Sequence, residues 1–404
     1  MKMKVLQINV VYGVGSTGKI VKDLANVMEQ NNIESYIAYG YGKSSEKNTI
    51  KIGTKLEYYI HNILSRITGK QGRYSYFATK RFLKKVDKIK PDIIHLHNIH
   101  GNYINYTLLF KYIKKNRIPI VWTLHDCWAY TGKCVYYDYN QCNKWKKKCE
   151  KCRQLKEYPT SYFFDSSENE YENKKKTFTS IENMYIVTPS NWLAKEVKES
   201  YLGKYPIQVI PNGIDLTQFK KIDSDFRPKH NIEDKFVILG VANEWSRRKG
   251  ANTFIELAKL LDDSYKIIMV GLTERQKKDL PSNIIKISKT NSIRELAEIY
   301  SCADVFMNPT LEDNFPTTNL EALACGTPVV TYDTGGSAES INSKCGIVVK
   351  KHDIIKLVEK IKKLKNNNLN SEDCIMQSEN YDKKKCFKIY ISLYKKISKN
   401  KGEK

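Results

Sequence analysis

Strand-like and helix-like segments alternate along this chain in two successive series, and this alternation constrains its fold most. In the first half, apolar strand-length segments such as residues 5–12 and 93–96 alternate with helical ones such as residues 19–31. A second series starts at residues 208–210 and continues through residues 236–241. Parallel strands need helices on both faces of their sheet. The pattern therefore predicts an α/β protein with two Rossmann-like, doubly wound domains.

The point where the alternation restarts sets the expected domain boundaries. We expect an N-terminal domain over residues 1–205, with a cysteine-rich insertion at residues 127–152. A second domain follows over residues 206–375, and residues 376–404 form a helical tail that packs back on the first domain. A chain of 404 residues is long enough for two or three domains with separate cores.

The chain is strongly basic, because 68 Lys and Arg residues against 44 Asp and Glu give a net charge of +24. Nucleic acid, an anionic bilayer surface or phosphorylated substrates would all suit this charge. No nucleic-acid-binding motif is visible, so we expect no nucleic acid partner. The first apolar segment lacks a signal-peptide cleavage site, and no segment approaches the roughly 18 apolar residues of a membrane span. We therefore expect a cytoplasmic protein, whose ten cysteines are thiols or metal ligands rather than disulfides.

A glycine-rich loop at residues 13–19 joins the first strand to the first helix. Its sequence matches the dinucleotide-binding pattern GxGxxG and nearly matches the P-loop. However, the second strand ends without the acid that would hold a ribose, and Ile20 replaces the hydroxyl that a P-loop needs. What remains is a donor-rich loop at a helix N-terminus, with Gly15 and Gly18 placed to face a phosphate or a sugar. A strand-to-helix turn without a ligand is the alternative.

Histidines gather at two strand ends in the first half. One strand ends in His95, His97 and His100, and the next ends in His125 and Asp126. In a doubly wound sheet, these ends lie on the same edge as the glycine loop. Imidazoles there can donate to a sugar hydroxyl or a phosphate oxygen, and His97 is the best candidate. The three clustered histidines form only a weak zinc-binding pattern. For each histidine, a purely structural role is the alternative to a role in binding or catalysis.

Four cysteines follow within a short segment: Cys134, Cys142, Cys149 and Cys152, with Cys127 just upstream. The pair Cys149-x-x-Cys152 resembles half of a zinc knuckle, and the other two cysteines would complete a four-thiolate site. A loop of this length inside a domain usually needs such an anchor. Structural zinc is therefore one expectation. Free thiols, and disulfides or a redox role, are the alternatives.

Three strand ends in the second half carry polar residues suited to a ligand. Asn212 lies in a turn after the first strand, and Asn243 begins a basic segment that includes Arg248 and Lys249. Lys249 lies beside a helix N-terminus, where it would clamp a diphosphate. Residues 309–330 hold two adjacent acids, a short helix and Gly-Thr-Pro before another strand. Carboxylates at this edge suit the paired hydroxyls of a sugar or ribose, although a capped helix with incidental acids has the same pattern.

In their order along nearly the whole chain, these motifs resemble those of family 4 glycosyltransferases, which have the GT-B fold. The matching segments are the glycine loop, the histidine strand end, Thr188-Pro189-Ser190, residues 211–215, Lys249-Gly250 and residues 321–328. The sequence is similar in particular to the branch that makes bacterial exopolysaccharide, capsule and colanic acid. The resemblance implies two Rossmann-like domains facing across a cleft. It also implies retaining sugar transfer from a nucleotide-sugar donor, with no metal or other cofactor required for catalysis.

The resemblance implies roles for residues of the second domain. Lys249 would hold the donor diphosphate, and Glu321 would bind the nucleotide ribose. The family has an earlier acid separated from this glutamate by seven residues, and that position is Asp313, which would face the donor sugar. Glu312 is one position off this spacing, so which of the two acids faces the sugar stays open. The backbone of Asn314, Phe315 and Pro316 would cover the donor sugar, and Asn212 would also bind the donor. The family's arginine six positions before the lysine is replaced by Asn243, and either Arg247 or Arg248 would supply its charge.

The resemblance places the remaining candidates in the first domain. His97 would contact the transferring sugar or the forming oxyanion, and Gly15 and Gly18 would line the same cleft. His100, His125 and Asp126 would lie on the acceptor side.

We therefore expect an enzyme that moves a sugar from a UDP- or GDP-sugar to a lipid-linked glycan in surface polysaccharide biosynthesis. It would contact the inner face of the cytoplasmic membrane peripherally. A nucleotide-sugar epimerase of the same fold and a zinc-containing nucleic-acid-binding protein are the alternatives.

Overall fold

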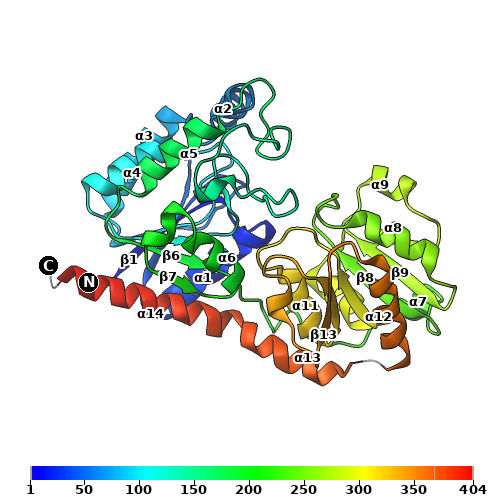
Figure 1. The fold of residues 1–404 in the computed structure, drawn as a ribbon. Coiled ribbons are helices and arrows are strands. Elements are labelled where there is room, and N and C mark those ends of the chain that lie inside the picture. Colours follow the sequence, from blue (N-terminus) through cyan, green and yellow to red (C-terminus); the bar gives the residue numbers. More distant parts are fainter. Residues whose placement is uncertain (1, 368, 403–404) are drawn as a thin grey trace. The chain divides into compact units, whose positions relative to one another are not determined.

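The computed structural model describes residues 2–367 and 369–402, and Figure 1 shows its helices and strands. The chain forms two compact units. One unit runs to Ile210 and resumes at Phe387, and the other spans Pro211–Cys386. Each unit contains one parallel sheet with helices on both faces, so the predicted pair of Rossmann-like domains is confirmed.

The sheet of the first unit has seven strands in the order β3-β2-β1-β4-β5-β6-β7. Its central strands β4 and β5 are buried along their whole length, because helices cover both faces of the sheet. The strands are β1 (Lys4–Val11), β2 (Glu34–Tyr41), β3 (Thr49–Lys51), β4 (Ile93–Leu96), β5 (Ile120–Thr123), β6 (Met184–Thr188) and β7 (Ile207–Val209).

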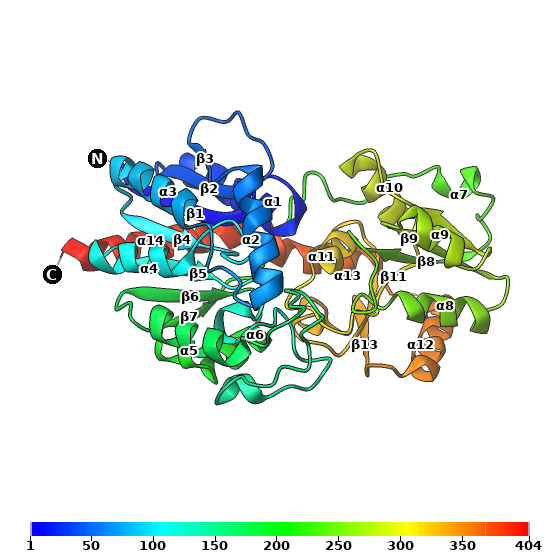
Figure 2. The same ribbon diagram turned by 90° about the horizontal axis from the view of Figure 1, so that it is seen from above.

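The helices of the first unit form two layers. In Figures 1 and 2, α3, α4 and α5 lie side by side on one face of the sheet, and α14 lies on the opposite face. The C-terminal part of α14 packs on this unit, where Tyr394 Oη lies 2.6 Å from His95 Nδ1 and Tyr390 Oη lies 3.0 Å from Thr123 Oγ1. The helices are α1 (Gly15–Gln30), α2 (Lys55–Thr68), α3 (Tyr76–Ile89), α4 (Tyr106–Lys115), α5 (Ser167–Phe178), α6 (Asn191–Lys198) and α14 (Lys383–Gly402), which begins in the second unit.

The sheet of the second unit has six strands in the order β10-β9-β8-β11-β12-β13. These are β8 (Phe236–Val241), β9 (Tyr265–Val270), β10 (Ile284–Ile287), β11 (Val305–Asn308), β12 (Val329–Tyr332) and β13 (Gly346–Val349). Helices α8 and α12 pack together, as do α10, α11 and α13. The helices are α7 (Phe226–Lys229), α8 (Ala251–Leu260), α9 (Glu274–Asp279), α10 (Ile293–Cys302), α11 (Thr317–Ala324), α12 (Ile354–Asn366) and α13 (Ser371–Ser378).

The unit boundaries differ from the expected domain boundaries at two places. The first unit extends to Ile210 instead of residue 205, because β7 pairs with β6 and completes the first sheet. The second unit extends to Cys386 instead of residue 375, because α13 packs on α11 and Ile214 N donates to the Tyr381 carbonyl at 2.9 Å. Within the described residues, no helix has both the length and the apolar character needed to cross a membrane.

In both sheets the strand order reverses at one point, and this position decides where ligands bind. The reversal falls between β1 and β4 in the first sheet and between β8 and β11 in the second. In open α/β sheets, ligands bind beyond the carboxyl ends of the strands at such a point. The loops after β1, β4, β8 and β11 are therefore the natural places to look for a site.

Candidate active site

Lys249 and Asp313 meet at the strand-order reversal of the second sheet. Lys249 lies in the loop after β8 and Asp313 in the loop after β11, and Lys249 Nζ is 2.6 Å from Asp313 Oδ2. Burial opposes ionisation of Asp313, but the charges of Lys249 and Arg248 outweigh it and hold the pKa of this carboxyl below its usual value. The loop therefore presents a charged, hydrogen-bonded pair whose side chains are 23% and 13% exposed.

Close backbone contacts bring these two loops together. Gly250 precedes α8 with φ +75°, and a Cβ there would lie 2.2 Å from the carbonyl oxygen of Pro309, so only glycine fits. Leu311 N donates to the Arg248 carbonyl at 2.7 Å, and Arg248 Nη1 donates to the Glu312 carbonyl at 2.7 Å. The backbone thus fixes which residue faces Lys249, and in this register it is Asp313 rather than Glu312.

The start of α11 lies directly after Asp313. Pro316 is its N-cap residue and makes no side-chain cap hydrogen bond. Uncapped N–H groups at a helix N-terminus are suited to anionic ligands. Two contacts hold Phe315 in place: its carbonyl accepts a hydrogen bond from Asn212 Nδ2 at 3.1 Å, and its ring packs on Tyr381. Asn314 is buried in the same segment.

Glu321 lies further along α11, where its carboxylate accepts a hydrogen bond from Tyr300 Oη at 3.1 Å. The buried Asn319 holds this helix to strand β11, because its Oδ1 accepts a hydrogen bond from Asn308 Nδ2 at 2.8 Å. Its Nδ2 donates to Ser340 Oγ at 3.0 Å. Asn319 was not singled out from the sequence, since a lone Asn in a short helix gives no signal. Asn243, in contrast, is exposed.

A glycine pair after β12 also supports the Asp313 loop, and the sequence analysis missed it. Gly336 N donates to the Asp313 carbonyl at 3.2 Å. Gly335 has φ +52°, and a Cβ there would lie 2.0 Å from the same carbonyl oxygen. The Thr-Gly-Gly-Ser sequence after a strand was the available signal for this close approach.

Three histidines of the first unit line a small cavity at the carboxyl ends of β4 and β5. The lining residues are His97, Asn98, Ile99, His100, Trp122, Leu124, His125, Asp126, Trp128 and Ala129. His100 Nε2 lies 2.6 Å from Asp126 Oδ2, and Trp128 N donates to Asp126 Oδ1 at 2.9 Å. Burial raises the pKa of Asp126, but His100 and the hydrogen bonds outweigh it, so its pKa is lowered.

A hydrogen-bonded chain fixes the tautomers of two of these histidines. Gln7 Nε2 donates to the Val21 carbonyl at 3.0 Å, so Gln7 Oε1 faces His97 Nε2 at 3.2 Å. His97 Nε2 must then carry the proton, and His97 Nδ1 accepts from His125 Nε2 at 3.0 Å. Burial holds the pKa of His97 well below its usual value and lowers the pKa of His125 to about 4, so both rings are neutral. Gln7 is a positioning residue that the sequence analysis missed.

The predicted contact between His97 and the transferring sugar would require one of these hydrogen bonds to open. His97 is buried, and both of its ring nitrogens are used within the first unit. As placed, His97 orients His125. His100, His125 and Asp126 line the same cavity.

The glycine loop joins β1 to α1 beside these histidines. Asn98 N donates to Asn9 Oδ1 at 3.2 Å, which ties the ends of β4 and β1 together. Gly15 has φ +64° and open space where a Cβ would lie. At Gly18, a Cβ would lie 3.2 Å from Gly13 N. The N-cap residue of α1 is Val14, which makes no side-chain cap hydrogen bond, and such a helix N-terminus is suited to an anionic ligand.

The predicted zinc cysteines come together only in part. Cys134 Sγ lies 3.8 Å from Cys152 Sγ, a separation close to the ~3.8 Å edge of a zinc–sulfur tetrahedron. Cys149 Sγ instead accepts from Gly132 N at 3.2 Å, and Cys142 packs against the apolar core. Among the described residues, no three or more His, Cys, Asp or Glu side chains are arranged to hold a metal ion. The cysteines as placed supply a pair rather than a four-ligand site, so zinc stays a prediction.

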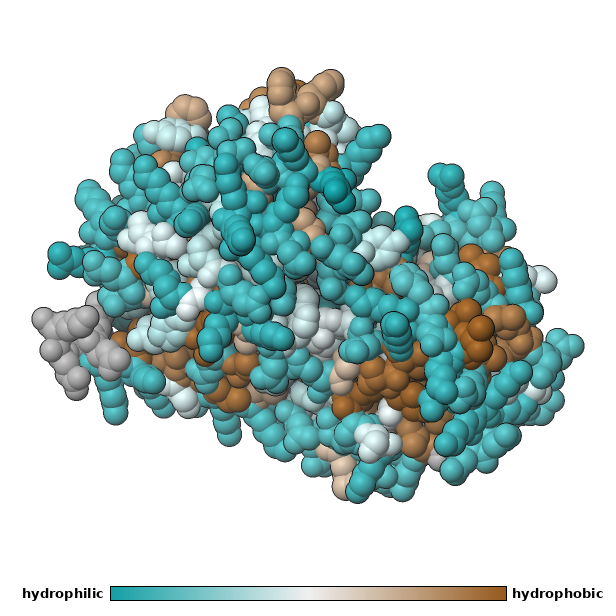
Figure 3. Space-filling model, in the orientation of Figure 1, coloured by the Kyte–Doolittle hydropathy of each residue, from teal (hydrophilic) through white to brown (hydrophobic). Residues whose placement is uncertain are grey.

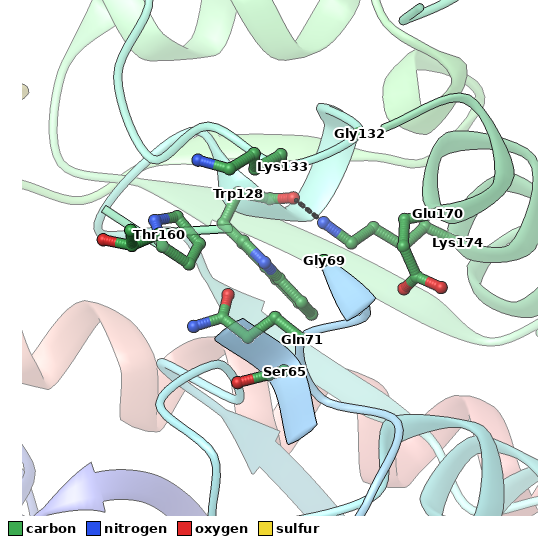
Figure 4. Close-up of a pocket in the computed structure, with 10 residues that line it drawn as sticks. Ser65, Gly69, Gln71, Trp128, Gly132, Lys133, Thr160, Glu170 and Lys174 are labelled. Atoms are coloured by element: carbon green, nitrogen blue, oxygen red, sulfur yellow. Dashed lines mark hydrogen bonds between the residues drawn. The ribbon is translucent and has the colours of Figure 1, made fainter. Parts of the chain in front are cut away.

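A second, polar cavity lies at the C-terminal end of α2 (Figure 4). Lys174 of α5 is buried there, donates to the Trp128 carbonyl at 2.9 Å and stands 3.6 Å from the centre of the Trp128 ring. Burial lowers the pKa of Lys174 to about 7 and raises the pKa of Glu170. Among the described residues, Gln71 Oε1, Trp128 Nε1 and Glu170 Oε1 lack a hydrogen-bond partner. From α2 and the turn after it, Ser65, Gly69 and Gln71 line this cavity.

Comparisons with known protein families divide the chain near the boundary between its two units. Glycosyltransferase Family 4 matches residues 17–218, and Glycosyl transferases group 1 matches residues 223–383. These two matches cover the loops that carry the histidines and the Lys249–Asp313 pair.

Individual relatives and solved structures agree with the family matches. A putative colanic acid biosynthesis glycosyl transferase of Escherichia coli is 24% identical over 88% of this chain and 90% of its own. An N,N'-diacetylbacillosaminyl-diphospho-undecaprenol α-1,3-N-acetylgalactosaminyltransferase of Campylobacter jejuni is 27% identical over 56% of this chain and 63% of its own. The crystal structure of Anabaena HepE with UDP-glucose has a TM-score of 0.68 at 12% identity, over 98% of this chain and all of that one, and shows a shared fold.

Proposed function

Because the chain belongs to glycosyltransferase family 4, we propose that it transfers a sugar from a nucleotide-sugar donor to a lipid-linked glycan, with retention of anomeric configuration. The product would be a bacterial surface polysaccharide. The named relatives support this proposal: one is assigned to colanic acid biosynthesis, and another takes its name from an undecaprenyl-linked acceptor. The Anabaena structure holds UDP-glucose, so UDP-sugars are the first donors to test.

One observation carries the proposal, namely the Lys249–Asp313 pair at the strand-order reversal beside the uncapped start of α11. In our proposal, Lys249 and the first N–H groups of α11 hold the donor diphosphate. Charge builds up on this group as the glycosidic bond breaks, and fixed positive groups stabilise that charge more in the transition state than in the ground state. No metal is needed for this step.

Asp313 has two tasks in this proposal. Its carboxylate orients the Lys249 ammonium at 2.6 Å, and it stands beside Asn314 and Phe315, whose backbone would cover the donor sugar. Glu321, further along α11, would accept hydrogen bonds from the ribose hydroxyls of the nucleotide. His100, His125 and Asp126 of the first unit would serve the acceptor.

Two linked measurements test the proposed function. Thermal-shift screening against UDP-, GDP- and ADP-sugars should identify one nucleotide that raises the melting temperature, because ligands that bind only the native state stabilise it. Nucleoside diphosphate should then be released only when a lipid-linked glycan is added. Conversion of the nucleotide-sugar with no acceptor present would favour the epimerase instead. Salt-sensitive binding of random RNA or DNA without any nucleotide-sugar binding would favour a nucleic-acid-binding protein.

A further inference from the structure

Helix α2 turns polar side chains toward the protein interior and apolar side chains toward solvent, the reverse of what is usual for a helix of a globular domain. Its two fully buried positions are His61 and Ser65. His61 Nδ1 lies 2.7 Å from Ser75 Oγ, and Ser65 Oγ donates to Asn102 Oδ1 at 3.0 Å. Ser65 also lines the polar cavity of Figure 4, and His61 Nε2 accepts from Gly72 N at 3.2 Å, so both inward side chains have polar surroundings. A surface helix normally turns its apolar stripe toward the core.

The apolar stripe of α2 faces solvent instead. Its exposed members are spaced one or two turns apart on one side of the helix, at Leu56, Tyr59, Ile60, Ile63 and Ile67. Ile60 and Ile63 at the centre are 49% and 58% exposed. The helix is fixed at both ends, by a capping box between Thr54 and Glu57 and by the left-handed Gly69. The exposed stripe is therefore part of a well-defined helix and not of a frayed segment.

A neighbouring loop extends this apolar surface. Tyr162 N donates to the Arg66 carbonyl at 2.8 Å, and Ser166 Oγ donates to the Thr68 carbonyl at 2.6 Å, so the loop lies against the end of α2. Its exposed aromatic side chains are Tyr162, Phe163 and Phe164, of which Phe163 is 74% exposed. We call these three residues and the five of α2 the α2 apolar face. Figure 3 shows apolar side chains at the top of the molecule, where Figure 1 places α2.

The two chain segments that carry the α2 apolar face are rich in basic residues, and we call these basic residues its basic rim. Residues 55–70 and 151–165 contain six basic residues, Lys55, Arg66, Lys70, Lys151, Arg153 and Lys156, against the three acids Glu57, Glu157 and Asp165. Glu57 is already neutralised by Arg81 at 2.6 Å, and Asp165 accepts from Cys152 N at 2.6 Å. Exposed aliphatic and aromatic side chains beside Lys and Arg are the composition of a helix that lies in a membrane interface.

We propose that the α2 apolar face docks on an anionic lipid bilayer. The stripe and the aromatic loop would enter the headgroup region, and the basic rim would pair with lipid phosphates. Charge favours this occupant over a second copy of the chain, since each copy carries a net charge of +24 and brings the same basic rim. The inference does not depend on the proposed sugar transfer, because lipid binding needs neither donor nor acceptor.

Vesicle co-sedimentation of the full chain tests this proposal without measuring activity. The wild type should bind vesicles of phosphatidylcholine mixed with phosphatidylglycerol, and bind phosphatidylcholine vesicles much more weakly. The double variant Ile60→Asp with Ile63→Asp should need at least ~10-fold more anionic lipid for half-binding. Phe163→Ser gives a second, independent variant in the loop. Because all three side chains are exposed, circular dichroism and melting temperature should remain as in the wild type.

A matched control comes from the other unit. Ile355 of α12 is 80% exposed, and Ile355→Asp makes the same chemical change far along the chain from the α2 apolar face. This variant should bind anionic vesicles like the wild type. Added salt should weaken wild-type binding, since the basic rim contributes through screened charges. The proposal is overturned if the wild type ignores anionic vesicles, if the double variant binds them unchanged, or if sedimentation equilibrium shows a dimer that the double variant dissociates without any lipid binding.

Discussion

Replacing Lys249 by Met should damage both the stability of the second unit and the turnover of the enzyme. The change removes the ammonium 2.6 Å from Asp313 and leaves a carboxylate that is only 13% exposed without its nearest partner. Breaking a fully buried pair costs about 3–5 kcal/mol and an exposed pair about 0–1 kcal/mol. For this partly buried pair we expect a loss of about 1–3 kcal/mol in the free energy of unfolding, seen as a lower melting temperature.

Turnover should fall by at least ~100-fold in the same variant, the scale of losing one charge that stabilises a transition state. The two effects separate in a double-mutant cycle. Asp313→Asn should destabilise the wild type clearly but cost little in the Lys249→Met background, because the pair is already broken. Lys259→Met removes the same charge from the exposed end of α8. This variant should leave the melting temperature unchanged and turnover within about twofold of the wild type.

The pH dependence of stability gives a further check on the pair. The pKa of Asp313 is lowered in the folded protein, so its pairing stabilises the fold above the unfolded pKa of about 3.9. This contribution disappears as the pH falls through the lowered folded pKa. The difference in stability between wild type and Lys249→Met should therefore be constant from about pH 5 to 8 and shrink below about pH 4. Near-normal turnover of Lys249→Met, or additive effects in the cycle, would refute the assignment of the clamp.

Other residues give shorter tests. Glu321→Ala should lower kcat/KM for the donor by at least ~100-fold, while the exchange Glu312→Ala should harm turnover less than Asp313→Ala does. Gln7→Leu removes the acceptor for His97 Nε2, so turnover should fall and nitrogen NMR should show a change in the His97 tautomer. Elemental analysis should find about one zinc per chain, and Cys149→Ser should lower the melting temperature more than it weakens donor binding. Protein without zinc and with an unchanged melting temperature in Cys149→Ser would remove the zinc prediction.

The sequence alone predicted the two sheets well, because alternating strands and helices are local patterns. It set the domain boundaries less well, since the edge strand β7 has three residues and is defined by its pairing with β6. The tail was predicted to start at residue 376, but α13 belongs with α11 through tertiary contacts that no local pattern encodes.

For the candidate site, the sequence indicated the residue types but not their pairing. Lys249 and Asp313 are 64 residues apart in the chain, and only the close packing around Gly250 brings them together. Gln7 and Asn319 act by orienting other groups from buried positions, where a polar residue gives no distinctive pattern. The amphipathic stripe of α2 was visible in principle, but a stripe does not tell which of its faces turns to solvent.

The central claim, retaining sugar transfer from a nucleotide-sugar to a lipid-linked glycan, is tested most directly by proton NMR of the reaction product. The purified enzyme is supplied with the α-linked nucleotide-sugar selected in the thermal-shift screen and with a lipid-linked glycan extract, and the new anomeric signal is recorded. We predict one new α-glycosidic linkage, formed in equal amount to the nucleoside diphosphate released and lost in Lys249→Met. A β-linked product would contradict retention, and an altered nucleotide-sugar formed without acceptor would contradict transfer itself.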